Sequence, residues 1–170
     1  MFNMTKTEEN LLAAFAGESQ ANRKYLAFAK KAENEGFPNI AHLFRAAAAA
    51  ETVHAHNHLR ALGGIKSTEE NLKEAIGGEF YEFTDMYPDF ISDAETDGNS
   101  SAKRSFNYAN DVEKIHHKLY EKALESVENG KDLEKTEIYI CPVCGYTHEG
   151  TPPDKCPVCG AVKKVFQKVE

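Results

Sequence analysis

Glu51-Thr-Val-His54 and its echo Glu113-Lys-Ile-His116 are the two stretches that decide the fold of this chain. In an α-helix, residues three positions apart lie on the same face, with their Cβ atoms about 5 to 6 Å apart. Each glutamate can therefore share one metal ion with the histidine of its own motif. Two such motifs on separate helices predict a helical core that is organised around bound metal.

The two motifs belong to an internal repeat. Ala32-Glu33-x-x-Gly36 is echoed by Ala94-Glu95-x-x-Gly98, and Phe44 and Phe106 each lie eight residues after those glycines. Each Glu-x-x-His motif begins fifteen residues after the same glycines. Four matching features in register predict two duplicated helical hairpins that are related by an approximate two-fold axis.

Each hairpin also carries a glutamate at a matching position upstream of its motif. Glu18 precedes Glu51 by 33 residues, and Glu79 precedes Glu113 by 34. A di-iron carboxylate bundle takes one glutamate from each of two helices and a Glu-x-x-His motif from each of the other two. Several carboxylates in one core need cations to offset their charge, and oxygen ligands with imidazole favour iron or manganese.

The spacing differs by one residue between the halves. Tyr25 and Tyr87 keep the register, because each lies seven residues before the alanine of the repeat, so the extra residue falls between Glu79 and Tyr87. We predict a π-bulge there, which would turn Glu82 inward beside Glu79. For Tyr25 and Tyr87 two roles stay open, namely core packing and hydrogen bonding to ligand carboxylates.

The remaining pattern predicts a mainly α protein. Capping boxes start at Thr5 and Ser67, and glycines end the helical segments. The predicted helices run over residues 5–35, 38–62, 67–98, with an interruption or kink at Pro88, and 99–129. They form a four-helix bundle in a domain of residues 1–132, followed by a small domain of residues 136–170 with strand-like runs at 137–140 and 162–169.

The small domain contains every cysteine of the chain. Two Cys-Pro-Val-Cys-Gly knuckles supply them, and the cysteines are Cys141, Cys144, Cys156 and Cys159. Two C-x-x-C pairs at this spacing indicate a metal site rather than disulfides. Four thiolates hold zinc or a single iron. Spacing alone favours zinc, but an electron-carrying iron is the more useful neighbour for a di-iron centre.

Composition excludes some classes of function. The 170 residues include 27 acidic and 20 basic side chains, a formal charge of -7, which argues against a nucleic-acid partner. The first ten residues lack the apolar segment of a secretory signal. Small or apolar runs such as Ala46 to Ala50 are too short to cross a membrane. We expect a cytoplasmic protein with no membrane association.

Three stretches resemble the rubrerythrin family, and the similarity covers essentially the whole chain. They are Phe15-Ala-Gly-Glu-Ser-Gln20, Gly78-Glu-Phe-Tyr-Glu-Phe-Thr-Asp-Met-Tyr-Pro88 and the pair of cysteine knuckles. The resemblance implies a ferritin-like four-helix bundle followed by a rubredoxin-like Fe(Cys)4 domain. It also implies two irons in the bundle, one iron in the cysteine site and peroxidase activity.

The resemblance further assigns roles to residues. It implies that the di-iron ligands are Glu18, Glu51, Glu79, Glu82, Glu113 and His116, with Glu51 and Glu113 bridging. In this family one iron exchanges a glutamate for a histidine on reduction, and the matching positions are Glu82 and His54. The residues expected to take part in catalysis are therefore Glu82, His54, Tyr25 and Tyr87.

The expected reaction is the two-electron reduction of hydrogen peroxide to water, in defence against oxidative stress. The Fe(Cys)4 centre would pass on electrons from NAD(P)H. The chain has no Gly-x-Gly-x-x-Gly fingerprint, so the reductase must be a separate flavoprotein or rubredoxin reductase. In this family electrons pass between subunits of a head-to-tail dimer, which implies a homodimer or larger assembly.

Two other functions compete with this one. A ferroxidase that handles iron would share the bundle site, and a metal-binding protein with a structural zinc ribbon would share the knuckles. A second open question concerns the short joint Gly63 to Ser67. This joint constrains whether the hairpins pair within one chain or exchange between subunits, and the sequence leaves both arrangements open.

Overall fold

The computed structural model describes residues 4–170. The chain divides into two compact units, with the break between Lys66 and Ser67. Each unit contains one of the two predicted hairpins. Within the described residues, no helix combines the length and the apolar character needed to cross a membrane.

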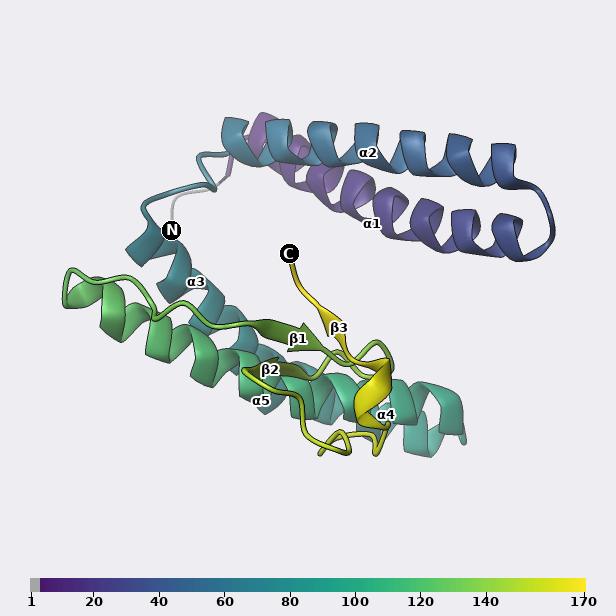
Figure 1. The fold of residues 1–170 in the computed structure, drawn as a ribbon. Coiled ribbons are helices and arrows are strands. Elements are labelled where there is room, and N and C mark those ends of the chain that lie inside the picture. Colours follow the sequence, from purple (N-terminus) through teal and green to yellow (C-terminus); the bar gives the residue numbers. More distant parts are fainter. Residues whose placement is uncertain (1–3) are drawn as a thin grey trace. The chain divides into compact units, whose positions relative to one another are not determined.

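The first unit is a hairpin of two long helices, α1 (Lys6–Asn34) and α2 (Pro38–Ala61), which run side by side (Figure 1). Thr5 caps α1 through the predicted capping box, in which its backbone N–H donates to Glu8 Oε2 at 2.7 Å. Gly36 ends the turn with a φ of 83°, a conformation that favours glycine. Both predicted helices of this half are confirmed.

Small side chains allow α1 and α2 to approach closely. The buried residues of this hairpin are Ala29, Ala32, Ala41, Ala48 and Ala55. At one end the aromatic side chains of Tyr25, Phe28 and Phe44 cluster, with the Phe28 and Phe44 ring centroids 5.7 Å apart. The alanine seam therefore holds the two helices at a fixed distance.

The second unit begins with a helix that changes its winding. α3 (Thr68–Tyr81) passes into the π-helical segment η1 (Glu82–Met86), which continues as α4 (Tyr87–Thr96). The Tyr87 N–H donates to the Glu82 carbonyl five residues earlier, which confirms the predicted π-bulge. Pro88 lies where the hydrogen-bond pattern changes, so its missing N–H does not end the helix.

The second hairpin closes with α5 (Ser100–Glu128), which packs against α3 and α4 (Figure 1). Asn99 caps it, because its side-chain Oδ1 accepts the Ala102 N–H at 3.1 Å. The predicted start and end of this helix are confirmed. Within the second unit, Val112 is the buried residue of α5.

The cysteine-rich segment forms a three-stranded antiparallel sheet in the order β2-β1-β3. Its strands are β1 (Ile138–Ile140), β2 (Thr147–Glu149) and β3 (Gln167–Lys168), and a short 3-10 turn, η2 (Lys163–Val165), precedes β3. The strand predicted over 162–169 is wrong over its first half, because the chain turns there. The domain boundaries 1–132 and 136–170 stay a prediction.

Candidate metal centres

The first hairpin brings together three of the predicted ligands. Glu18 lies on α1, and Glu51 and His54 lie on α2, with ligand atoms of all three within 4.8 Å of one another. His54 Nδ1 is 2.8 Å from Glu51 Oε2 and 3.9 Å from Glu18 Oε1. The i, i+3 spacing and the alanine seam thus produce a half-site with two carboxylates and one imidazole.

The second hairpin repeats this geometry. Glu79 on α3 and Glu113 and His116 on α5 also have ligand atoms within 4.8 Å of one another. His116 Nδ1 is 2.7 Å from Glu113 Oε2 and 3.9 Å from Glu79 Oε1. The two half-sites therefore agree to within about 0.1 Å in the corresponding distances. The duplicated sequence therefore produces two half-sites with the same geometry.

The second half-site concentrates negative charge. Burial and the neighbouring Glu113 carboxylate raise the pKa of Glu79 to about 7. Burial and the same Glu113 charge also raise the pKa of Glu82. Carboxyl groups that crowd each other in this way are stabilised as anions by a cation. The donor set of the half-site thus fits a bound metal ion.

The π-helical segment brings Glu82 into the field of this cluster. Glu82 lies outside the group of ligand atoms that meet within 4.8 Å, yet it interacts electrostatically with Glu113. Burial and the charges of Glu82, Glu113 and Glu79 raise the pKa of Tyr87, so the Tyr87 hydroxyl also faces these carboxylates. Glu82 is therefore near enough to serve as a further ligand after a side-chain movement.

The tyrosines expected beside the ligands pack in aromatic clusters. Tyr25 contacts Phe44 with ring centroids 6.2 Å apart, and Tyr87 contacts Phe106 at 6.3 Å. The same tyrosine–phenylalanine pair thus occurs at equivalent positions in both hairpins. Among residues 4–170, neither tyrosine hydroxyl makes a hydrogen bond, so their role in catalysis stays a prediction.

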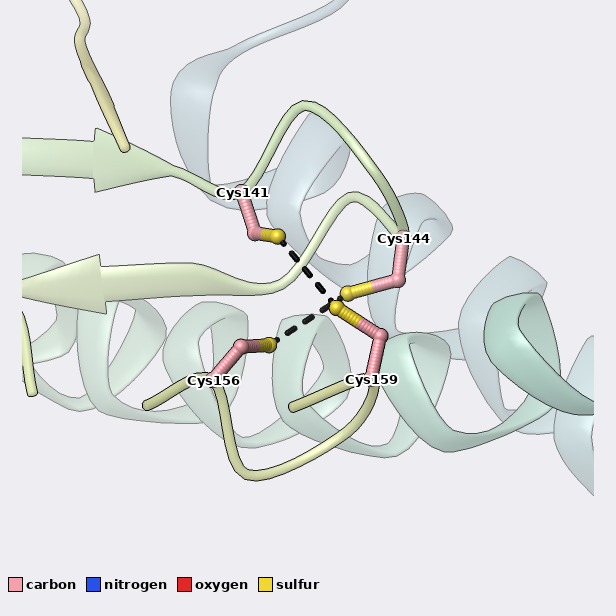
Figure 2. A group of neighbouring side chains, drawn as sticks. All are labelled: Cys141, Cys144, Cys156 and Cys159. Carbon is pink, nitrogen blue, oxygen red and sulfur yellow. Dashed lines mark hydrogen bonds between the residues drawn. The ribbon is translucent and has the colours of Figure 1, made fainter. Parts of the chain in front are cut away.

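The four cysteines converge from the two knuckles (Figure 2). The sulfur atoms of Cys141 and Cys159 are 3.6 Å apart, and those of Cys144 and Cys156 are 3.5 Å apart. A disulfide would need about 2.05 Å, whereas a tetrahedral ion with bonds of about 2.3 Å has its sulfur atoms about 3.8 Å apart. The cysteines are thus free thiols in the arrangement of a tetrahedral metal site.

Backbone amides surround these sulfur atoms. The N–H of Tyr146 is hydrogen-bonded to Cys144, and that of Ala161 to Cys159. Burial raises the pKa of Cys144 strongly, and neighbouring thiols add to this effect. A bound cation would reverse this preference for the neutral thiol, and the amide hydrogen bonds would stabilise the thiolates.

The cysteine domain contacts the helical half-site of its own unit. His116 Nε2 lies 2.9 Å from Thr147 Oγ1, and Thr147 Oγ1 donates to the Gly145 carbonyl at 3.3 Å. Because the Thr147 hydrogen is used in this way, its oxygen accepts the Nε2–H of His116. The Nδ1 atom of His116 is then the one that is available to a metal, once it loses any proton shared with Glu113.

Two further contacts fix the cysteine domain on α5. A Cβ atom placed on Gly145 would lie 3.8 Å from Cγ1 of the buried Val112, so the first knuckle packs against α5 at Val112. Lys122 donates to Glu149 at 2.6 Å. Sequence reasoning missed Thr147, Gly145 and Val112 as parts of the site. For Thr147, the one available signal in the sequence was its position three residues after Cys144.

Comparisons with known proteins agree with both sites. The family described as Rubrerythrin matches residues 9–124, and the family described as Rubrerythrin, rubredoxin-like domain matches residues 139–167. These ranges contain all the half-site residues and all four cysteines, respectively.

Relatives of known name match nearly the full chain. Rubrerythrin-2 of Clostridium acetobutylicum is 38% identical over 95% of this chain and 95% of its own length. Nigerythrin of Nitratidesulfovibrio vulgaris is 38% identical over 94% of this chain and 85% of its own. A solved structure of fully reduced, all-ferrous nigerythrin is similar with a TM-score of 0.58 and 36% identity, over 98% of this chain and 88% of that one. On the matched domains, their order and the relatives that share both, this chain belongs to the rubrerythrin family.

Proposed function

We propose that this protein reduces hydrogen peroxide to water with electrons that arrive through its Fe(Cys)4 centre. The observation that carries the proposal is the pair of matching half-sites together with the direct contact between His116 and the cysteine domain. The overall reaction consumes one peroxide, two electrons and two protons and yields two waters.

Membership of the family establishes the general class of activity and the metals of both sites. The protein is an oxidoreductase of the rubrerythrin family, with a ferritin-like bundle, a di-iron site and a rubredoxin-like Fe(Cys)4 site. When bound, the irons supply the electrons for reduction of the substrate. The residues described below bind these ions, orient the ligands and handle protons.

We assign the di-iron ligands to the two half-sites combined. Glu18, Glu51 and His54 would come from one hairpin, and Glu79, Glu82, Glu113 and His116 from the other. Glu51 and Glu113 each lie beside a histidine of the same helix, at 2.8 and 2.7 Å, so each pair could share one ion. The resemblance to the family adds a bridging role for both glutamates. This set contains one more ligand than four glutamates and two histidines, as an exchange between two ligands requires.

The two histidines differ in how firmly they are held. His116 is anchored on its far nitrogen by Thr147 and is 28% exposed, whereas the His54 side chain is 53% exposed. Among residues 4–170, the ion-pair partners of His54 are carboxylates of its own hairpin. These differences support a permanent ligand role for His116 and an exchange between His54 and Glu82.

Two groups at the site are suited to hold a proton. Burial and the Glu113 charge raise the pKa of Glu82, so the Glu82 carboxyl, when it is not bound to iron, would be able to give a proton to an oxygen of peroxide. The carboxylates around Tyr87 raise the pKa of its hydroxyl, which keeps the phenol protonated as a donor. We propose these as the proton-handling groups.

The electron path runs through the contact between the domains. Gly145 follows Cys144 directly, its carbonyl accepts from Thr147, and Thr147 accepts from the His116 ring. This chain of bonds and hydrogen bonds links the thiolate site to a di-iron ligand within one chain, whereas the family resemblance implies transfer between subunits. It supports transfer from the Fe(Cys)4 centre to the half-site on which the domain sits.

Replacing Thr147 with valine tests this path. The Thr147→Val variant keeps the shape of the side chain but removes the acceptor for His116 Nε2. We expect electron transfer between the two iron sites to slow and activity to fall by about tenfold to 100-fold, the usual effect on activity of losing a partner of a metal-bound histidine. The variant should also change the reduction potential of the di-iron pair. Rapid-mixing spectroscopy and a redox titration measure the two effects.

The matched control is Thr136→Val, an exposed threonine in the segment before β1. This variant should leave both quantities unchanged. Equal rates and potentials in the Thr147→Val and wild-type proteins would remove Thr147 from the path.

We further propose the partners and location. The electron source is a separate NAD(P)H-dependent flavoprotein or rubredoxin reductase, and the protein works in the cytoplasm as a homodimer or larger homo-oligomer. The four cysteines are free thiols, which supports a reducing compartment.

Stopped-flow oxidation of the fully reduced protein tests the proposed reaction. We expect peroxide to oxidise the di-iron site at least about tenfold faster than oxygen at equal concentration. A ferroxidase would instead react readily with oxygen and accumulate iron. A zinc-ribbon protein would be colourless, whereas Fe(III) with four thiolates is red. Equal rates with the two oxidants would contradict the peroxidase assignment.

A further inference from the structure

We propose that the outer side of the first cysteine knuckle, together with the first turns of α5, is the docking site of the electron donor. The donor would be a protein with an acidic surface, and one of its carboxylates would bind Arg104. The inference rests on the proposed function, because it names the kind of partner that delivers electrons to the cysteine site. All the residues involved belong to the second unit.

The four cysteines differ in their exposure. Cys141 and Cys156 are buried, with 0% and 3% exposure, whereas Cys144 and Cys159 are partly exposed (Figure 2). Val143, which directly precedes Cys144, is 57% exposed. The metal site is therefore nearest to solvent at the second cysteine of each knuckle. A donor that contacts Val143 would be separated from a ligand of the metal by a single residue.

A surface cavity of about 470 Å³ opens beside Val143. Its other lining residues share one face of α5 at helical spacing, and they are Ser101, Arg104, Ser105 and Tyr108. Arg104 is exposed, and among the described residues it has no ion-pair partner. A guanidinium group binds a carboxylate through two parallel hydrogen bonds, and the neighbouring hydroxyl groups can add to them. The cavity is thus suited to a carboxylate.

The repeat shows that this cavity lining is particular to the second hairpin. The two halves of the repeat are offset by 62 residues, so Arg104 corresponds to His42 and Tyr108 corresponds to Ala46. The first hairpin therefore lacks both the arginine and the tyrosine. These side chains occur in the hairpin whose last helix carries the cysteine domain, which supports a role at the cysteine site.

The charge around the knuckles favours a negatively charged partner. The whole chain has a formal charge of -7, whereas residues 141–165 contain three lysines and two acidic residues, a formal charge of +1. The three lysines, Lys155, Lys163 and Lys164, are exposed, and none has an ion-pair partner in the described part of the chain. Together with Arg104, they place positive charge beside both knuckles. Opposite charge on a partner accelerates and orients its approach.

The chemistry of the cysteine site requires a donor of single electrons. A site closed by four thiolates has no open position for a hydride, so NAD(P)H cannot reduce it directly. The donor therefore carries electrons singly and has to bring its own redox group close to Val143. A carrier protein with carboxylates around its redox group meets both requirements, because Arg104 would fix its orientation.

Stopped-flow mixing with carriers of opposite charge tests this docking site. Reduced flavodoxin serves as the acidic one-electron donor, and a basic c-type cytochrome serves as an acceptor from the reduced protein. The measurements use about 0.1 M salt, at which charges more than about 10 Å away are largely screened. The Arg104→Glu variant should accept electrons from flavodoxin at least about tenfold more slowly, with a weaker dependence on salt. Its transfer to the basic cytochrome should not slow.

Three further variants make the comparison specific. Arg104→Lys keeps the charge and should keep the salt dependence. Lys131→Glu reverses a charge beyond the other end of α5, about 36 Å or more from Arg104 along the helix, and should keep the wild-type rate. Arg104→Gln repeats the test without a new negative charge, should the Arg104→Glu protein be produced poorly.

Binding to protein with zinc in the cysteine site gives a second measurement that involves no electron transfer. Flavodoxin should bind this protein about tenfold more weakly when it carries Arg104→Glu, because association is slower. Equal rates and affinities in the wild-type and Arg104→Glu proteins would overturn the docking site. So would a wild-type rate with flavodoxin that falls when the salt concentration is lowered. Both outcomes would leave the proposed function in place, since the preference for peroxide over oxygen tests it separately.

Discussion

Substituting Glu113 with glutamine should empty the bundle site and lower peroxidase turnover by more than about 100-fold. Loss of a residue that only supports a metal ligand already costs 10-fold to 100-fold in metal affinity or activity. Glu113 is closer to the chemistry, because its carboxylate lies 2.7 Å from His116 and interacts with Glu79 and Glu82. The neutral amide cannot bridge two cations.

The measurement is iron content together with peroxide-dependent turnover. Glu51→Gln should give the same result, because Glu51 occupies the equivalent position of the repeat. Glu125→Gln, an exposed glutamate farther along α5, is the matched control and should keep both iron and activity. A Glu113→Gln protein with full bundle iron and normal turnover would show that this carboxylate is not a ligand.

The second large effect concerns the cysteine site. Replacing Cys144 and Cys159 with alanine takes one ligand from each knuckle and should abolish binding of the Fe(Cys)4 iron. Turnover with NAD(P)H and a reductase is then expected to fall by more than about 100-fold, because the di-iron site loses its electron supply. Chemically reduced protein should still react with peroxide once, at a rate close to wild type.

Comparison of these two assays separates electron delivery from chemistry. Bundle iron is measured in the same samples to show that the helical sites remain loaded. Protein with zinc in an intact cysteine site is the matched control for folding, and it should show the same loss of reductase-driven turnover. Normal turnover of the double variant with the reductase would mean that electrons enter elsewhere.

Local features of this fold follow from particular residues. The capping residues Thr5 and Ser67 start their helices as predicted, because their side chains satisfy amides that a helix leaves unpaired. The π-helical segment at Glu82 follows from a one-residue excess between two otherwise matched repeats. The Glu-x-x-His pair of each half-site follows from the i, i+3 rule, and the glutamate on the neighbouring helix follows from the repeat.

Features that depend on contacts between distant residues could not be predicted from the local sequence pattern. β2 went unpredicted because Thr147-His148-Glu149 has no alternation of apolar and polar residues, and its place is set by pairing with β1. The contact of Thr147 with His116 joins residues 31 positions apart, and nothing local to either residue encodes it. Side-chain docking of this kind depends on the path of the whole chain.

The duplication shows how a site with two metals can arise from one hairpin. A single hairpin supplies two carboxylates and an imidazole, enough to bind one ion but with positions left open. In the proposed di-iron site, a second copy of the hairpin would supply the remaining ligands of both ions. The differences between the copies, Glu82 on its π-helical segment and the anchor of His116 on Thr147, then make the two irons unequal.

Mössbauer spectroscopy of the oxidised, iron-loaded protein tests the central claim most directly, namely that the carboxylates of both hairpins hold a pair of irons beside one Fe(Cys)4 ion. We expect two signals with areas in the ratio of two to one. The larger should come from antiferromagnetically coupled, oxygen-bridged ferric ions, and the smaller from a high-spin ferric ion with four thiolates. A bundle signal from isolated, uncoupled ferric ions would contradict the account.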